Sequence, residues 1–390
     1  MKKERPFLMI ITAPLLCTTC AIMMLTSCGR PASRTVDVSR AAPADMETVA
    51  SSWELLPVDE SEIPLPQITE VKRYGAKTFI SAGRYPNASK VYVLDGTRPA
   101  RVLDAYGRGP GEYQDAESFA FCEETSELII NDRKFKGFRR YRVPDMTWVS
   151  DEHTGVYLQH FESLDATHSV FFIEPHEPDP GKMVIWDHTR SEAAYSMEVS
   201  EMAAFLGAEL RMTRAGKGVV YFGVPGKDTE IWKATKSGFS RVGAIGLVPD
   251  AFAAIWDEKD SEMLSEELES ILGSGNTLGI GADAPLVDAG KMAFWYFTGF
   301  DNEPAWQLAI STSGSSQAIS ALTVEGYPEP LQVIGTGDSE WCSVLLPELL
   351  EDIPSPKGKL YPQLRELASQ GFETVLLFWS AGPSPVKPHP

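Results

Sequence analysis

The chain is poor in positive charge. Among 390 residues, 35 Lys and Arg stand against 54 Asp and Glu, which gives a formal net charge of −19. Nucleic-acid binding requires clustered basic side chains that neutralise phosphates, so this balance argues against that class of partner. Five cysteines are too few for a scaffold held together by disulfides. Hydrophobic residues at 43% and charged residues at 23% are ordinary for a globular protein and exclude disorder of the whole chain.

Motifs for catalysis and metal binding are also scarce. The six histidines form no HxH or HxxxH pair, so the sequence offers no zinc site. It contains no G-x-S-x-G nucleophile elbow. We therefore predict no metal, no cofactor and no catalytic residue.

The N-terminus carries the strongest signal in the sequence. Lys2, Lys3 and Arg5 form a basic start, and an uncharged apolar run follows over residues 7–24. The run ends in LTSCG, where two small residues precede Cys28, and this order resembles a bacterial lipoprotein signal. The resemblance implies removal of residues 1–27 and acylation of Cys28, whose several acyl chains anchor a protein stably. An ordinary secretory signal or a transmembrane anchor is the alternative.

The residues after Cys28 bear on where the protein lies. In some Gram-negative bacteria, acidic residues directly after the lipidated cysteine mark export to the surface. Here the first acidic residue is Asp37. We therefore expect an outer-membrane lipoprotein of the cell envelope that faces the periplasm rather than the surface. Of the cysteines left after cleavage, Cys122 and Cys342 either pair or remain buried thiols, and the second state is favoured.

Composition divides the rest of the chain into three parts. Residues 28–52 are rich in Ala, Ser, Pro and Arg without apolar periodicity, which predicts a flexible tether that holds the folded domain clear of the membrane. Residues 53–382 contain short aromatic and β-branched runs between turn residues, which is typical of strands. Residues 383–390 are predicted to be a disordered tail. Helices are expected only over residues 251–272 and 362–370.

The strand-like runs recur loosely. Three of them end in Asp95, Asp132 and Asp187, and the interval between units is about 40–55 residues. A unit of a few antiparallel strands cannot bury both of its faces alone, so such units pack side by side in a ring. At about 50 residues each, residues 53–382 would supply six or seven blades of a β-propeller. Separate β-sandwiches joined by linkers are the alternative, although no linker-like segment interrupts the range.

One segment resembles a known family. Residues 106–113, YGRGPGEY, contain a GxGPGEY pattern similar to that of secreted six-bladed β-propeller lipoproteins of Gram-negative gut bacteria. The similarity extends loosely over residues 69–379 and is weakest over residues 153–201. It implies six blades and no particular activity. We therefore predict an all-β, six-bladed β-propeller with short helical insertions.

The same segment has a chemical interpretation of its own. It fits neither a P-loop nor a dinucleotide-binding fingerprint. We expect a tight connection between blades rather than a ligand loop, with Glu112 accepting backbone N–H bonds and Tyr113 packed between blades. The residues assigned to this structural role are Gly107, Gly109, Pro110, Gly111, Glu112 and Tyr113.

A basic stretch over residues 133–142 stands out against the acidic total. Its side chains could contact an anionic glycan, a lipid headgroup or an acidic partner, and Arg133, Arg139 and Arg140 are the candidate binding residues. An exposed hairpin whose basic residues guard an outer strand is the alternative.

Three functions remain open. The first is a membrane-anchored lipoprotein whose propeller binds a glycan, a peptide or an envelope protein, without catalysis. The second is an extracytoplasmic hydrolase or lyase that acts on a polysaccharide or lactone, in which Asp95, Asp132 and Asp187 would place carboxylates at one mouth of the ring. The third is a structural component of a cell-envelope complex. The first is favoured because no catalytic set is visible.

Overall fold

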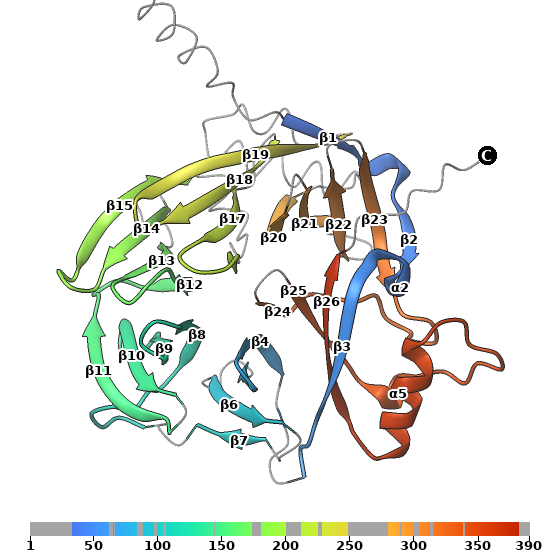
Figure 1. Cartoon of the computed structure of the whole chain (residues 1–390), viewed down its shortest axis with the longest axis horizontal. Coiled ribbons are helices and arrows are strands. Elements are labelled where there is room, and N and C mark those ends of the chain that lie inside the picture. The colour runs from blue at the N-terminus through green and yellow to red at the C-terminus, as the bar shows by residue number, and fades with distance from the viewer. Residues whose placement is uncertain are drawn as a thin grey trace, which may run out of the picture.

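A computed structural model places strands around a central axis (Figure 1). It describes residues 33–381, except 62–64, 66, 84–88, 97–99, 104–106, 144, 174–180, 200–211, 225–227, 249–279, 289–290, 299–304, 313–314 and 338–339. Five hydrogen-bonded sheets, the largest of which spans two blades, form six blades, which confirms the predicted fold. The helix expected over residues 251–272, the signal peptide, Cys28 and the tail lie outside the described residues.

The first three blades use consecutive strands. Blade 1 contains β4 (Ile68–Tyr74), β5 (Lys77–Ala82), β6 (Lys90–Asp95) and β7 (Arg101–Val102). Blade 2 contains β8 (Ala116–Cys122), β9 (Glu127–Asp132), β10 (Gly137–Arg142) and β11 (Thr147–His153). Blade 3 contains β12 (Leu158–Ser163), β13 (His168–Ile173), β14 (Lys182–Asp187) and β15 (Glu192–Glu198).

Blades 4 and 5 also use consecutive strands, whereas blade 6 takes one strand from the N-terminal part of the chain. Blade 4 contains β16 (Met212–Arg214), β17 (Val220–Val224), β18 (Asp228–Thr235) and β19 (Gly238–Val248). Blade 5 contains β20 (Ile280–Asp288), β21 (Lys291–Thr298), β22 (Ala305–Ser311) and β23 (Ser316–Thr323). Blade 6 contains β24 (Gly335–Gly337), β25 (Glu340–Leu345), β26 (Thr374–Ala381) and the N-terminal strand β3 (Ala50–Val58).

The ring is closed by the two ends of the folded chain. Strand β3 pairs antiparallel with β26 from Thr374↔Val58 to Ala381↔Ala50, so an N-terminal strand completes the last blade. On the other side of blade 6, β24 pairs with β4 of blade 1 at Gly335↔Val71. A Cβ on Gly335 would lie 2.3 Å from the Val71 carbonyl oxygen, so only glycine permits this approach.

The predicted tether is wrong for residues 33–52. These residues form β1 (Ser33–Asp37), the 3-10 helix η1 (Val38–Arg40), β2 (Ala42–Asp45), helix α2 (Met46–Val49) and the start of β3. Strand β1 pairs parallel with β19, and β2 pairs parallel with β23. We call residues 33–58 the strap, because they run along the outer edges of blades 4, 5 and 6 in turn (Figure 1).

Apolar clusters lie between neighbouring blades, as expected for blades that cannot bury both faces alone. Alternate residues of one strand serve opposite interfaces. On β5, Phe79 packs in the cluster between blades 1 and 2, whereas Ile80 packs in the cluster between blades 6 and 1. Each described junction has such a cluster. Cys122 and Cys342 are buried, unpaired thiols in two different clusters, as favoured from the sequence.

A helical insertion covers blade 6 between β25 and β26. It holds the 3-10 helix η3 (Pro347–Leu349) and helix α5 (Leu360–Ser369), which confirms the helix expected over residues 362–370. In residues 33–381, gaps excepted, no helix is long and apolar enough to cross a membrane.

Glu47 of the strap is bonded to the start of α5. Its Oε1 accepts the N–H groups of Lys359 at 2.8 Å and Leu360 at 2.6 Å, which have no acceptor within the helix. We expect Glu47→Ala to lower the free energy of unfolding by about 1 kcal/mol. Urea denaturation checks this value. Glu348→Ala, at an exposed position on η3, should change stability far less, and an equal loss in both variants would contradict the capping role.

Candidate functional site

The inner strands of the blades surround a cavity of about 400 Å³ near the axis of the ring. Its walls come from β4, β8, β12, β16 and β24, so five of the six blades contribute to it. Residues at or just before the start of these strands form most of the lining. Because every inner strand runs in the same direction, the cavity lies toward the face where one blade is connected to the next. The volume suits a small molecule or part of a larger one.

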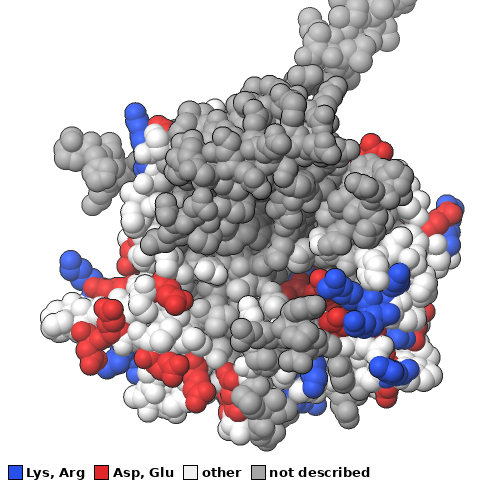
Figure 2. All heavy atoms as spheres, turned by 180° about the vertical axis from the view of Figure 1, so that it is seen from behind, with Lys and Arg blue, Asp and Glu red and all other residues white. Residues whose placement is uncertain are grey.

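Charged side chains are distributed unevenly over one face of the ring. Figure 2 shows Lys and Arg gathered on the side that carries blades 2 and 3, and Asp and Glu spread over the side that carries blade 6.

A buried ion cluster forms part of the cavity wall. Lys72 Nζ on β4 lies 3.0 Å from Glu70 Oε1, 2.5 Å from Glu162 Oε1 on β12 and 2.6 Å from the Phe119 carbonyl oxygen on β8. One ammonium therefore joins the inner strands of blades 1, 2 and 3. Glu70 Oε2 also accepts the Phe119 N–H at 3.1 Å. The side chains of Lys72 and Glu162 are 9% and 5% exposed, so these contacts are nearly free of solvent screening.

Burial and pairing act against each other in this cluster. Burial would lower the pKa of Lys72, but the attraction of Glu162 and Glu70 outweighs it, and the pKa is raised above its ordinary value. Burial raises the pKa of Glu162, and this exceeds the opposing attraction of Lys72 and Arg214. Two carboxylates thus share one ammonium, and burial, with a smaller contribution from the charge of Glu70, keeps the pKa of Glu162 raised.

Sequence reasoning did not identify this cluster. Glu70 and Lys72 are two positions apart on β4, so both side chains point to the same face of the strand. His160 and Glu162 both line the cavity from β12, which has a bulge at His160. Glu70 and Lys72, of opposite charge and two positions apart on one strand, were the available signal.

The glycine-rich segment forms a tight connection between β7 and β8. Glu112 Oε2 accepts the Gly109 N–H at 2.6 Å, and a Cβ on Gly107 would lie 2.1 Å from that oxygen. The Tyr113 ring is fully buried between blades 1 and 2, and its hydroxyl accepts the Val91 N–H at 2.9 Å. Each group has the surroundings expected for the structural role. None of residues 107–113, which the structure describes, lines the cavity.

The segment also packs against the outer strand of blade 2. Gly111 has a φ of +74°, and a Cβ there would lie 2.6 Å from Trp148 Cγ on β11. Tyr141 on β10 donates its hydroxyl to the Gly111 carbonyl oxygen at 3.1 Å. Gly111 is therefore required both by its backbone conformation and by the close approach of Trp148.

The three candidate binding arginines lie in different surroundings. Arg139 and Arg140 are buried and contact carboxylates: Arg139 meets Asp132 and Asp151, and Arg140 meets Glu127. These ion pairs favour a structural role, but β10 is the third strand of its blade, so neither the exposed hairpin nor the guarded outer strand describes it. Arg133 is exposed in the β9–β10 turn and lies 3.5 Å from Glu117, which lines the cavity.

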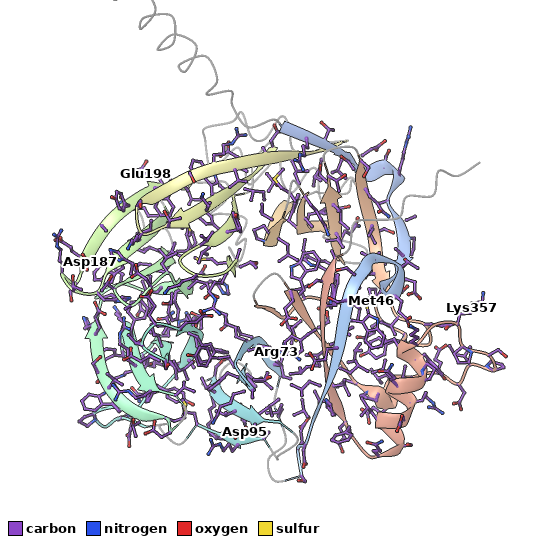
Figure 3. The ribbon with its side chains drawn as sticks, in the orientation of Figure 1. Met46, Arg73, Asp95, Asp187, Glu198 and Lys357 are labelled. Atoms are coloured by element: carbon purple, nitrogen blue, oxygen red, sulfur yellow. The ribbon has the colours of Figure 1, made fainter. Side chains whose placement is uncertain are left out.

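The three aspartates that end strands do not lie together at one mouth of the ring. Asp95 and Asp187 end third strands, whereas Asp132 ends a second strand. Strands alternate in direction within a blade, so third strands end at the opposite face from second strands. Asp95 and Asp187 lie at the rim of the ring, far from its centre (Figure 3), and Asp132 is fully buried. None of the three lines the cavity. The shared mouth expected from the sequence is therefore wrong.

Ser169, His188 and Glu152 form a hydrogen-bonded chain between blades 2 and 3. Ser169 Oγ lies 2.8 Å from His188 Nε2, and His188 Nδ1 lies 2.6 Å from Glu152 Oε2. The order resembles a serine-hydrolase triad. However, Ser169 is 0% exposed, so no substrate reaches its hydroxyl. The three side chains join blades 2 and 3.

The hydrogen bonds of His188 make the stability of the fold sensitive to mild acid. Burial lowers the pKa of His188 below 6.5, although Glu152 partly opposes the shift. Neutral His188 therefore stabilises the fold above pH 6.5, and this contribution is lost as the pH falls toward the folded pKa. We expect the free energy of unfolding to fall by up to about 1.4 kcal/mol per pH unit in that window. Urea denaturation from pH 8 to pH 5 measures it.

The matched comparison for this prediction uses two histidine variants. His188→Gln should flatten the pH profile below 6.5, whereas His153→Gln, at an exposed position on β11, should leave it unchanged. Parallel profiles for His188→Gln and the unmodified chain would contradict the assignment.

Comparison with known proteins gives the class of fold. The sequence matches no protein-family model and no curated protein. A solved structure of a putative exported protein from Bacteroides fragilis NCTC 9343 is similar, with a TM-score of 0.61 and 12% identity, over 90% of this chain and 100% of that one. At this identity the likeness shows the fold alone.

Two further solved structures have lower TM-scores, which carry no argument. The β-propeller domain of the Trilobed protease from Pyrococcus furiosus has a TM-score of 0.36 and 9% identity, over 72% of this chain and 91% of that one. Kuenenia stuttgartiensis hydrazine synthase has a TM-score of 0.39 and 10% identity, over 82% and 88%. The chain is a six-bladed β-propeller, closed by its own N-terminal strand.

Proposed function

We propose that the protein is an exported lipoprotein, anchored through Cys28, whose propeller binds a small polar ligand or part of a glycan or peptide in its central cavity. The observation that carries the binding proposal is the cavity itself, which five blades line with polar and charged side chains. Rigid strands hold these side chains in place, as a preformed binding site requires.

Two observations support export and anchoring. The N-terminal sequence has the order of a lipoprotein signal, and the Bacteroides fragilis structural neighbour is named as exported. We further propose that the protein resides in the outer membrane and faces the periplasm, because no acidic residue follows Cys28 before Asp37. Nucleic acid is not a proposed partner.

Metabolic labelling with an alkyne fatty acid tests the anchor. The full chain should carry label in the membrane fraction, and Cys28→Ala should lose the label. Cys17→Ala and Cys20→Ala are matched controls, because these cysteines lie inside the proposed signal and should not affect labelling. Retained label in Cys28→Ala would reject lipidation at this residue. Protease treatment of intact cells tests the face, since a periplasmic domain is protected.

A thermal-shift screen tests the cavity. The full chain is mixed with glycans, murein fragments, peptides and divalent metals, and a ligand at 100 times its dissociation constant stabilises by about 2.7 kcal/mol. Gln332→Trp, an exposed position at the cavity wall, should abolish a genuine shift, whereas Glu348→Trp on η3 should preserve it. A shift that survives Gln332→Trp would place binding elsewhere. If no compound shifts the melting temperature, a protein partner in an envelope complex becomes the better proposal, and pull-down from solubilised membranes tests it.

One observation favours a second function, hydrolysis or elimination in the same cavity. Glu162 lines the cavity and burial raises its pKa, which is the property that a general acid needs. Turnover of polysaccharides or lactones that Glu162→Gln abolishes would support this function. Equal turnover in both proteins would reject it.

A further inference from the structure

Lys72, the lysine of the ion cluster, has no hydrogen-bond donor left for a ligand. An ammonium group donates three hydrogen bonds, and Lys72 directs its Nζ to Glu70, Glu162 and the Phe119 carbonyl oxygen. A carboxylate or phosphate of a ligand would have to displace one of these buried contacts. The cluster therefore disfavours an anionic ligand, even though a lysine lines the cavity.

The two carboxylates of the cluster differ in how many of their oxygens have a protein partner. Glu70 receives Lys72 at one oxygen and the Phe119 N–H at the other. Glu162 receives Lys72 at Oε1, and within the described part of the chain no protein donor bonds its Oε2. Its side chain is 5% exposed, and it lines the cavity. A carboxylate oxygen at a cavity wall that receives no protein donor can accept a hydrogen bond from a ligand.

Arg214 is a further cation near the cluster. Arg214 attracts Glu162 electrostatically, but its guanidinium bonds the Phe121 carbonyl oxygen at 3.3 Å and Glu123 at 3.0 Å. When both carboxylates are ionised, the side chains of Glu70, Lys72 and Glu162 carry one negative charge in excess.

We propose that the ligand of the central cavity presents a cationic group, an ammonium or a guanidinium, which binds Glu162 Oε2 and completes the ion cluster. This inference rests on the proposed ligand-binding function. A charge-assisted hydrogen bond is roughly twice as strong as one between neutral groups, and shielding from bulk water strengthens it further. The acidic chain, with a net charge of −19, also draws cations toward it.

Matched compounds that differ in charge test the proposal. One set is 1,5-diaminopentane, 1,5-pentanediol and glutarate, and the other is glucosamine, glucose and glucuronate. Calorimetric titration of the full chain should show the amines binding at least about tenfold more tightly than the neutral members, and the acids most weakly. Acids that bind as tightly as amines, or amines that do not bind, would overturn the proposal.

Two glutamate variants link this preference to one side chain. Glu162→Gln keeps the shape of the side chain and removes its charge, so it should reduce the preference for amines by about tenfold or more. Glu127→Gln makes the same change in a buried carboxylate that pairs with Arg140 outside the cavity, and it should keep the preference. An unchanged preference in Glu162→Gln would reject the assignment.

The outcomes separate this inference from the proposed function. Suppose that neutral or acidic compounds bind best and that Gln332→Trp blocks their binding. The cavity would then be a ligand site, but the proposed preference for a cationic group would be rejected. Compounds of every charge that bind equally well to Gln332→Trp would instead show that the cavity is not the binding site.

Discussion

Replacing Lys72 with methionine should lower the free energy of unfolding by about 3–5 kcal/mol. The ammonium holds two buried carboxylates and the Phe119 carbonyl oxygen across blades 1, 2 and 3. Methionine fills similar space but leaves Glu70 and Glu162 facing each other's charge without compensation. Chemical denaturation with a fluorescence readout measures the loss.

Two further variants control this prediction. Lys77→Met removes a lysine on the neighbouring strand β5, whose ammonium lies 3.8 Å from the more exposed Asp95, and it should cost no more than about 1 kcal/mol. Adding Glu162→Gln to Lys72→Met should recover part of the loss, because one of the two stranded charges is removed. Equal losses for Lys72→Met and Lys77→Met would show that the cluster contributes little.

Removing the strap should prevent cooperative folding of the ring. The strap buries Val36, Met46, Val49 and Val58 against blades 4, 5 and 6, and β3 is the outer strand of blade 6. At about 1.5–3 kcal/mol for each buried side chain, the loss approaches the whole stability of a typical domain. A chain that begins at residue 59 behind an export signal should show no sharp thermal transition by circular dichroism.

A chain that begins at residue 33 is the matched control. It keeps β1, β2 and β3 and lacks only the residues before them, so it should melt sharply at the temperature of the full chain. If the chain that begins at residue 59 melted at that same temperature, the strap would be dispensable. The result would then return residues 33–58 to the role of a tether.

Local patterns predicted the ring but not its closure. Successive side chains of a strand point to opposite faces of the sheet, as Phe79 and Ile80 do on β5. Short runs of apolar residues between turns therefore predict the strands and the blades. The strap lacks that periodicity because β1 and β2 join the outer edges of existing blades largely through backbone hydrogen bonds. Composition alone therefore resembled that of a flexible segment.

The candidate site depends on how the blades are arranged around the axis. Glu162 lies 90 residues from Lys72 in the sequence, and only the packing of blades 1 to 3 around the axis brings their charges together. The strand-ending aspartates show the opposite case. They share a local pattern, but alternate strand directions send them to different faces of the ring.

The strap also limits how far the propeller can stand from a membrane. Five peptide units separate Cys28 from Ser33, where β1 joins the outer edge of blade 4, and they span at most about 18 Å. Under the proposed lipidation, the rim at blade 4 stays within this distance of the bilayer surface. The propeller is then attached to the membrane at its rim rather than at either of its faces. Ligands would reach the cavity from the thin layer of solvent beside the lipid headgroups, where membrane charge changes the local concentration of cations.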